Sequence, residues 1–343
     1  VADALALRLS GAEKERLTKR DTGDVGAYQL YLTGRYHWNK LIPPEIRQSI
    51  GFYQKAIDLD PNYALAYFGL AEAYRSLAIT ADVPPKEVCP QAITAAQKAI
   101  ALDPSLAEAH ASLVFSYIWY EWRWTEAEQE ATKAVELNPN SAFVHLAYAH
   151  MLSDLGRHEE AIRESRRAID LDPVSLLGNA LDGAFLYHAR RNDEAIVQLQ
   201  KTLELDQNFW IAHLFLGKAL LERKQYPEAI AEFTKARDFS GGNSEAISMI
   251  AYAWTRAGDP AKARTLLDEF LALSAQRYIP PYNIAAVYLG LGEYDQTFAW
   301  LEKAYTDHDV RLSFLRVDPK WHPVRDDPRF VSILQRIGLE STM

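Results

Sequence analysis

Small residues recur along this chain with a period of 34 positions. The first series is Ala127, Ala161, Ala195, Ala229, Ala263 and Thr297. A second series follows seven residues later, at Ala134, Ala168, Thr202, Ala236, Phe270 and Ala304, where Thr202 and Phe270 depart from alanine. A fixed period of about 20 to 50 residues is typical of a repeat array, and small residues are needed where two helices cross closely. The pattern therefore predicts a stack of helical units.

Each period contains two amphipathic helical segments joined by a short turn. These turns include Gly156-Arg157-His158, Gly258-Asp259-Pro260 and Gly292-Glu293-Tyr294. Glycine readily ends a helix, and a proline stops the second helix at Asp60-Pro61, Asp103-Pro104, Asn138-Pro139 and Asp172-Pro173. Each unit is therefore predicted to be a helical hairpin, and about eight hairpins fit. Their expected starts are Ala27, Ala64, Ala107, Ala142, Leu176, Trp210, Ser244 and Tyr278.

Several units resemble the tetratricopeptide repeat (TPR) family, whose pattern is W-x2-L-G-x2-Y followed by A-x3-F. The matching positions are Tyr67-x2-Leu70-Ala71-x2-Tyr74, His110-x2-Leu113, His213-x2-Leu216-Gly217 and Ala229-x3-Phe233-x2-Ala236. The resemblance covers roughly residues 27 to 309. It implies an all-α fold, a right-handed α-solenoid superhelix of about eight TPR hairpins, that binds other proteins.

Three segments are expected. Residues 27–309 form the array, and residues 310–343 form a C-terminal cap, in which Pro328 to Ile337 should make an amphipathic helix. The flanks Leu17–Lys40 and Arg316–Phe330 resemble those of TPR halves in large bacterial signalling proteins, which carry a kinase, cyclase or winged-helix domain upstream. That resemblance makes residues 1–26 an N-terminal helix or linker, the tail of a missing upstream domain.

Two places break the period. The segment Ala81-Asp82-Val83-Pro84-Pro85 contains two prolines that exclude helix, so it is expected to be an insertion at a hairpin tip. The turn from Trp119 to Trp124 holds three tryptophans and one extra residue, and this aromatic content suggests an exposed contact patch.

Bulk properties exclude several classes of function. The net charge is −9 and the sequence pI is near 5.5, whereas a nucleic-acid binder needs a basic surface. Cys89 is the single cysteine, so no intrachain disulfide or cysteine zinc site can form, and a reducing cytoplasmic location is expected. The longest apolar run, Leu113 to Trp124, is too short to span a bilayer.

No motif in the sequence indicates catalysis, a cofactor or a metal. The nine histidines invite such a role, but His110, His145 and His213 stand where the TPR pattern has a packing tryptophan. The stretch His158-Glu159-Glu160 lacks the second histidine of a zinc motif. We therefore expect a chain that is not an enzyme.

The predicted binding surface is the concave face, which the first helix of every unit lines. Counting from the repeat register places these side chains in the groove: Arg35, Trp38, Phe68, Glu72, Arg75, Phe115, Trp119, His150, Tyr187, His188, Lys218, Glu222, Tyr252, Arg256 and Tyr282. Aromatic and arginine side chains suit an extended peptide or a helix. Aromatic residues at helical spacing also commonly serve only as core.

Two other functions stay open at this point. The groove could act as the pocket of a small-ligand sensor or an enzyme-associated domain, in which His150, His188, Tyr187 and Tyr252 are the groups of interest. The array could instead be a spacer or dimerisation element with Trp122 and Trp124 at its edge.

Overall fold

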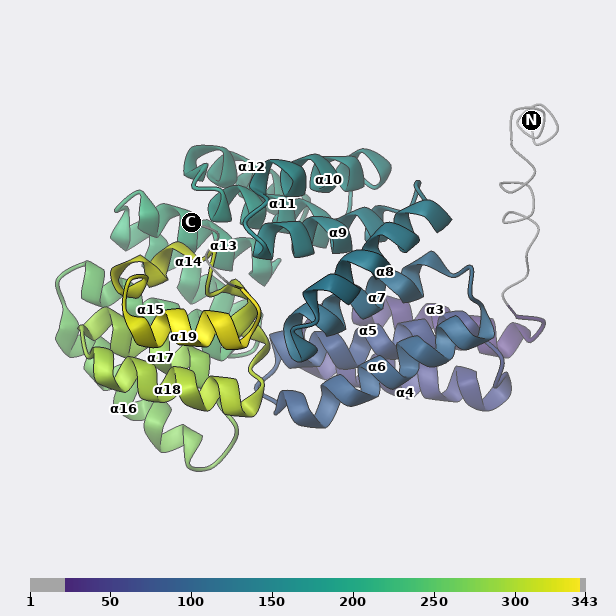
Figure 1. Ribbon diagram of the computed structural model, residues 1–343, viewed down its shortest axis with the longest axis horizontal. Coiled ribbons are helices and arrows are strands. Elements are labelled where there is room, and N and C mark those ends of the chain that lie inside the picture. The colour runs from purple at the N-terminus through teal and green to yellow at the C-terminus, as the bar shows by residue number, and fades with distance from the viewer. Residues whose placement is uncertain (1–21, 340–343) are drawn as a thin grey trace.

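The computed structural model describes residues 22–339, and within them every regular element is a helix. Eight hairpins follow one another (Figure 1). Their first helices are α3 (Val25–Trp38), α5 (Ala64–Thr80), α7 (Ala107–Ser116), α9 (Ala142–Asp154), α11 (Leu176–His188), α13 (Trp210–Glu222), α15 (Ser244–Arg256) and α17 (Pro281–Leu291). Their second helices are α4 (Pro43–Leu59), α6 (Pro85–Leu102), α8 (Trp124–Leu137), α10 (His158–Leu171), α12 (Asn192–Leu205), α14 (Tyr226–Phe239), α16 (Pro260–Ser274) and α18 (Tyr294–Asp307).

Four further elements complete the described chain. A π-helical turn, η1 (Tyr117–Glu121), extends α7 and absorbs the extra residue of that unit. After α18 come two 3-10 helices, η2 (Val310–Phe314) and η3 (Pro319–Val324), and then α19 (Pro328–Arg336). The predicted eight hairpins and C-terminal capping helix are confirmed. Six hairpins start at the predicted residue, while α3 and α17 start at Val25 and Pro281 instead of Ala27 and Tyr278.

The 34-residue period marks the closest helix crossings. Every member of the first series, from Ala127 to Thr297, is completely buried, and the second series is nearly so. Gly217 shows how tight these crossings are, because a Cβ atom added there would lie 2.5 Å from Cε1 of Phe233. A larger side chain would push the two helices apart, which explains why small residues recur at this spacing.

Histidines at the tryptophan position of the repeat join the two helices of a hairpin. Nδ1 of His145 lies 2.6 Å from Oε2 of Glu164, and Nε2 lies 2.9 Å from the carbonyl oxygen of Pro139. The same two contacts are made by His110 with Glu130 and Pro104, and by His213 with Glu232 and Gln207. Both ring nitrogens of each histidine therefore face oxygen atoms that can accept a hydrogen bond. The predicted structural role of these three histidines is confirmed.

The superhelix curves until its late hairpins meet its early ones (Figure 1). The indole Nε1 of Trp210 donates a hydrogen bond to the carbonyl oxygen of Leu41 at 3.0 Å. The side-chain amide of Asn243 donates to the carbonyl oxygen of Thr80, also at 3.0 Å. Asp82, in the predicted insertion between α5 and α6, accepts a hydrogen bond from Ser244 and pairs with Arg277 at 3.3 Å. The insertion thus forms one side of the seam where the ring closes.

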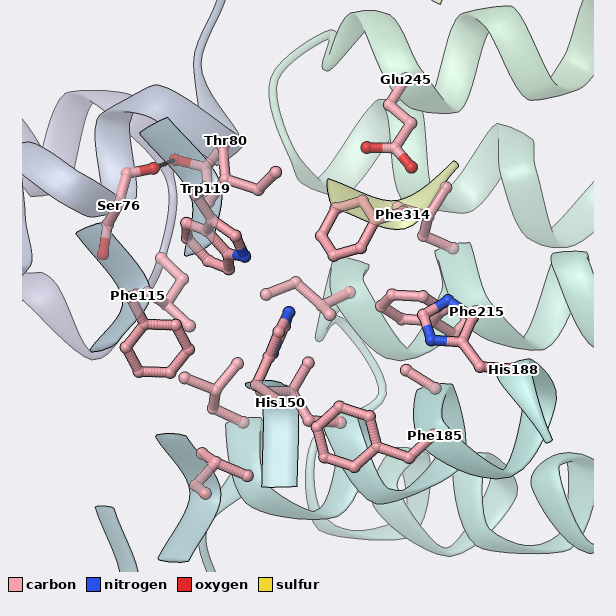
Figure 2. Close-up of a pocket in the computed structure, with 18 of the residues that line it drawn as sticks. Ser76, Thr80, Phe115, Trp119, His150, Phe185, His188, Phe215, Glu245 and Phe314 are labelled. Atoms are coloured by element: carbon pink, nitrogen blue, oxygen red, sulfur yellow. Dashed lines mark hydrogen bonds between the residues drawn. The ribbon is translucent and has the colours of Figure 1, made fainter. Parts of the chain in front are cut away.

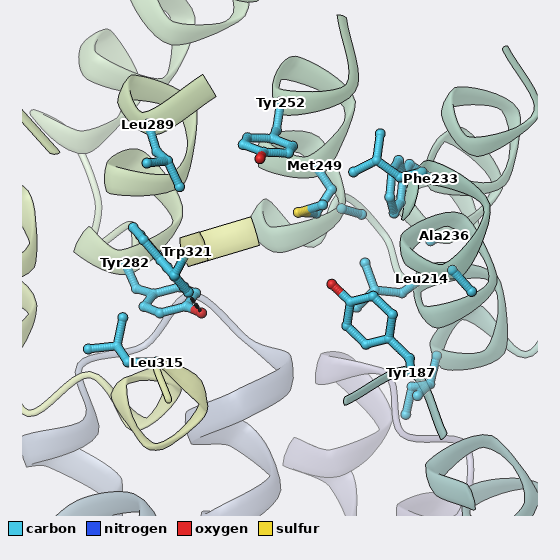
Figure 3. Close-up of a cluster of buried hydrophobic side chains, with 14 of the residues drawn as sticks. Tyr187, Leu214, Phe233, Ala236, Met249, Tyr252, Tyr282, Leu289, Leu315 and Trp321 are labelled. Carbon is cyan, nitrogen blue, oxygen red and sulfur yellow. Dashed lines mark hydrogen bonds between the residues drawn. The ribbon is translucent and has the colours of Figure 1, made fainter. Parts of the chain in front are cut away.

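The segment from Val310 to Val324, which we call the inner segment, lies inside this ring. Its apolar side chains Val310, Leu312, Leu315 and Trp321 are fully buried. Figure 3 shows Leu315 and Trp321 among aromatic side chains of α11, α15 and α17, and the Trp321 indole donates to the hydroxyl of Tyr282 at 2.8 Å. The carboxy-terminal residues therefore fill the concave side of the superhelix, which a cap on the last hairpin alone would leave empty.

The aromatic turn at residues 119–124 packs against the chain's own carboxy-terminal part. Trp122 stacks on Tyr305 and His308, with ring centroids 5.2 Å and 4.8 Å apart, and Nε1 of Trp124 donates to the carbonyl oxygen of Ile337 at 2.7 Å. The prediction of an exposed contact patch here was wrong, because the closed ring brings α18 and α19 against this turn.

Replacing His145 with asparagine should remove a pH-dependent part of the stability. The hydrogen bond that His145 donates to the Glu164 carboxylate raises the pKa of His145 above its ordinary value of 6.5, although burial opposes this. A pKa raised in the folded state stabilises the fold fully below about pH 6.5 and stops doing so as the pH rises through the raised pKa. As the pH rises from about 6 to 8.5, the urea midpoint of the wild type should therefore fall relative to the midpoint of His145→Asn.

Asparagine is the matched replacement because Asn179 takes the same place in the next repeat and donates to the carbonyl oxygen of Pro173 at 3.0 Å. His322→Asn, at an exposed position, is the control. Parallel pH profiles for the wild type and His145→Asn would contradict this account of the His145 and Glu164 pair.

Candidate functional site

Charged side chains anchor the inner segment beneath the concave face. Arg311 is buried and donates from Nε to Oε2 of Glu245 on α15 at 3.2 Å, and from Nη2 to the carbonyl oxygen of Ile79 on α5 at 2.6 Å. Its Nη1 lies 3.4 Å from Asp309, and Nζ of Lys218 on α13 lies 2.7 Å from Oε1 of Glu245. One guanidinium therefore connects the second hairpin to the seventh.

A second ion pair sits deeper on the inner segment. Asp318 pairs with Lys320, accepts a hydrogen bond from the hydroxyl of Tyr187 at 2.9 Å, and lies 3.9 Å from Nζ of Lys218. Burial alone would raise the pKa of Asp318, but the ammonium groups of Lys320 and Lys218 hold it below its ordinary value. Burial is likewise outweighed at Glu245, where Lys218 and Arg311 lower the pKa to about 2. Both carboxylates stay charged at neutral pH.

A cavity of about 100 Å³ lies between the first helices and the inner segment. Its walls come from α5, α7, η1, α9, α11 and α13, and Phe314 and Asp318 of the inner segment also line it (Figure 2). Most of the lining is aromatic or aliphatic, including Phe115, Phe185 and Leu214. The concave face of this superhelix is thus largely filled, and what remains of it is an apolar cavity that is partly open to the surface.

Two polar side chains in the cavity wall have no hydrogen-bond partner among the described residues. They are the indole Nε1 of Trp119 and both ring nitrogens of His150, and these side chains are buried. Figure 2 shows both rings turned toward the space at the centre of the pocket. Buried donors and acceptors are nearly always satisfied in folded proteins, so unsatisfied ones in a cavity wall point to something that fills the space.

The remaining polar groups of the cavity are paired or uncharged. Arg75 forms a bidentate pair with Glu72, and its guanidinium lies 4.2 Å from the ring centroid of Phe115 and 5.1 Å from that of Trp119. Burial lowers the pKa of His150 well below 6.5, and lowers the pKa of His188 to about 3. Both imidazoles are neutral near neutral pH. Among the residues that the structure describes, no group of three or more acidic, histidine or cysteine side chains could hold a metal ion.

All fifteen predicted groove residues lie on first helices or on η1, but most of them meet the chain itself. Arg75, Phe115, Trp119, His150, His188 and Lys218 line the cavity. Glu72, Tyr187, Tyr252 and Tyr282 are buried next to neighbouring helices or the inner segment. Trp38, Phe68 and Glu222 are half-buried, and Arg35 and Arg256 are exposed. Whether any of them contacts a partner remains a prediction.

The expectation of an open groove was wrong for the described chain, because residues beyond the repeats occupy it. Phe314 and Asp318 complete the cavity, and the repeat register gave no reason to place them there. One signal was present in the sequence: Asp309, Arg311, Asp318 and Lys320 alternate with apolar residues in a segment that otherwise has the composition of a core. Buried charges of both signs usually pair with each other.

Comparisons with known proteins identify the repeats. Models of the tetratricopeptide repeat match residues 186–244, residues 220–279, and residues 52–82 with 130–163. The chain therefore contains tetratricopeptide repeats, as the motifs predicted. No curated protein matches the sequence. None of the described helices has the length and apolar content that crossing a membrane requires.

Solved structures with the same fold are TPR proteins of low sequence identity. A chain of the APC/C hetero-tetramer Cut9-Hcn1 is 15% identical, with a TM-score of 0.63 over 98% of this chain and 58% of that one. TTC0263, a TPR protein of Thermus thermophilus, is 17% identical over 57% of this chain and 99% of its own, with a TM-score of 0.48. PilF of Pseudomonas aeruginosa is 22% identical over 59% of this chain and 91% of its own, with a TM-score of 0.43. At 15% identity, the likeness to the Cut9-Hcn1 chain shows the fold alone, a TPR-like solenoid.

Replacing Arg311 with methionine should destabilise the whole fold. The substitution leaves Asp309 buried without its cation and removes the link from α5 to α15, and breaking a buried ion pair in this way costs about 3 to 5 kcal/mol. Arg329→Met is the matched control, because Arg329 pairs with Asp295 and Asp327 at the exposed end of the same carboxy-terminal part. Exposed pairs contribute little. Urea unfolding followed by circular dichroism measures both, and equal midpoints for the two variants would contradict the role of Arg311.

Proposed function

We propose that this chain is a protein-binding TPR scaffold that docks a partner helix on the outer face of α3. The role is one of binding and not of catalysis. TPR-like solenoids bury their own repeats by stacking each hairpin on the next, and the end hairpins carry the faces that nothing stacks on. The observation that supports the proposal is the exposed apolar stripe on α3.

The stripe consists of Val25, Tyr28, Leu32 and Tyr36, which are 71%, 47%, 44% and 63% exposed. The last three are four residues apart, so they lie on one side of the helix. Few large hydrophobic side chains elsewhere in the described chain are this exposed, and they do not form such a row. Contiguous apolar surface of this kind usually marks an interaction site.

The position of α3 defines what fits there. In later hairpins the first helix has a hairpin on each side, whereas α3 packs mainly against α4 and α5. An amphipathic helix of a partner can therefore stack on α3 as the repeats stack on each other, with its apolar side on Leu32 and Tyr36. Arg35, one of the predicted binding residues, lies on the same face and can pair with an acidic residue of that helix.

The proposal extends to the setting of the array. The flanks Leu17–Lys40 and Arg316–Phe330 resemble those of TPR halves in multidomain bacterial signalling proteins, so we assign the chain to the interaction or sensory module of such a protein. A cytoplasmic location is part of this proposal. Burial raises the pKa of the Cys89 thiol to about 12, so this thiol is protected and unreactive.

A double substitution, Leu32→Glu with Tyr36→Glu, should abolish capture of the partner and leave the fold intact, since both side chains are exposed. Val197→Glu is the matched control because Val197 is an exposed apolar residue on α12. We expect the same protein to copurify from a bacterial lysate with the wild type and with Val197→Glu. It should not copurify with the double variant. Isothermal titration with the purified partner should then show an affinity loss of at least about 30-fold, typical of hot-spot residues.

Equal capture by the double variant would contradict the stripe as the docking surface. Capture of a second copy of this chain would favour a dimerisation element instead. A chain that starts at Thr22 provides a further check, because it keeps the whole stripe and should bind the same partner.

A further inference from the structure

We propose that the cavity beneath the inner segment binds a small neutral molecule that has one aromatic ring and one hydroxyl group, a ligand of the phenol class. This site is separate from the stripe on α3 and does not depend on it. The proposal rests on the size of the cavity, its aromatic walls, the unpartnered nitrogens of Trp119 and His150, and the pairing of every charge around it.

The size and walls of the cavity favour a single ring. A dry, closed cavity of about 150 Å³ lined by aliphatic and aromatic side chains holds one benzene molecule. This cavity of about 100 Å³ is partly open, so it limits a ligand to one ring whose small substituent can lie toward the opening. Phe115, Phe185 and Phe314 present their rings to the space, and His150 makes edge-to-face contacts with Phe115, Trp119 and Phe185. An aromatic ligand can continue this arrangement of edges against faces.

The unpartnered nitrogens favour a hydroxyl group. The indole of Trp119 can only donate a hydrogen bond, and a neutral imidazole such as that of His150 has one nitrogen that accepts. A single hydroxyl can accept from Trp119 and donate to His150, which satisfies the indole N–H and the accepting nitrogen of the imidazole at once. A carboxylate cannot donate to His150, and a hydrocarbon satisfies neither group.

The charges around the cavity favour a neutral ligand. Arg75 is paired with Glu72, Lys218 with Glu245, and Lys320 with Asp318. Asp154, which lies 3.9 Å from Nε2 of His150 and outside the cavity lining, is fully buried, and burial raises its pKa well above its ordinary value. An ionic ligand would therefore add a buried charge without a counter-ion, which is costly.

Part of the cavity wall reaches the surface. Phe143, Leu177 and Phe215 line the cavity and are only half-buried, so side-chain movement there can admit a small molecule. Rotamer changes of such partly exposed side chains are fast. Entry does not require the inner segment to leave the ring.

The proposal is tested on the full chain with phenol and toluene, which differ by a hydroxyl in place of a methyl group. Isothermal titration should give one saturable site for phenol, with an affinity about tenfold higher than for toluene, the contribution of a net hydrogen bond. Trp119→Phe keeps an aromatic ring and removes the N–H donor, so it should reduce that tenfold preference to about twofold or less. Trp254→Phe, outside the cavity, should keep the preference of the wild type.

Three results would overturn the site. The first is no saturable phenol binding by the wild type, which would mean that only water fills the cavity. The second is equal affinities of the wild type for phenol and toluene. The third is an unchanged preference for phenol in Trp119→Phe. If Trp119→Phe fails to fold by circular dichroism, the comparison of phenol with toluene in the wild type decides the question alone.

Discussion

The buried guanidinium of Arg311 connects an early hairpin of this solenoid to a late one. It bonds Glu245 on α15, Asp309 beside it, and the carbonyl oxygen of Ile79 in the last turn of α5. Carbonyl groups at a helix end have no partner within the helix and carry partial negative charge, so a buried cation is well placed there. A buried charge is costly unless all its partners are in position, and this requirement fixes the distance between the second and seventh hairpins.

Closure of the ring determines which surfaces can function. The inner segment covers the concave face, so the side chains that a TPR groove would offer to a peptide, such as Tyr187 and Tyr252, are buried. What remains of the groove is a small apolar cavity with two unsatisfied side chains in its wall. A row of exposed apolar side chains lies at the free edge of the first hairpin, on α3. The site proposed for a partner protein and the site proposed for a small ligand are therefore separate on the molecule.

The sequence predicted what depends on local contacts and missed what depends on closure. Ala229 and its equivalents pack within their own hairpins, so their spacing identified the repeats and six of the hairpin starts. Six of the fifteen residues that the repeat register placed in the groove line the cavity, whereas Arg35 lies on the exposed face of α3. Trp122 and Arg311 are different, because their partners are far away in the sequence and depend on small rotations summed over several repeats. No single repeat contains that information.

The central claim is that the carboxy-terminal residues keep the ring closed, and a distance across the seam tests it most directly. Spin labels at Lys86 and Gln276, both exposed and on opposite sides of the seam made by Asp82 and Arg277, would report it in a Cys89→Ala background. The account predicts one short, narrow distance in the full chain and a longer, broad distribution in a chain that ends at Asp307 but keeps its helical content. The same narrow distance in both chains would contradict it.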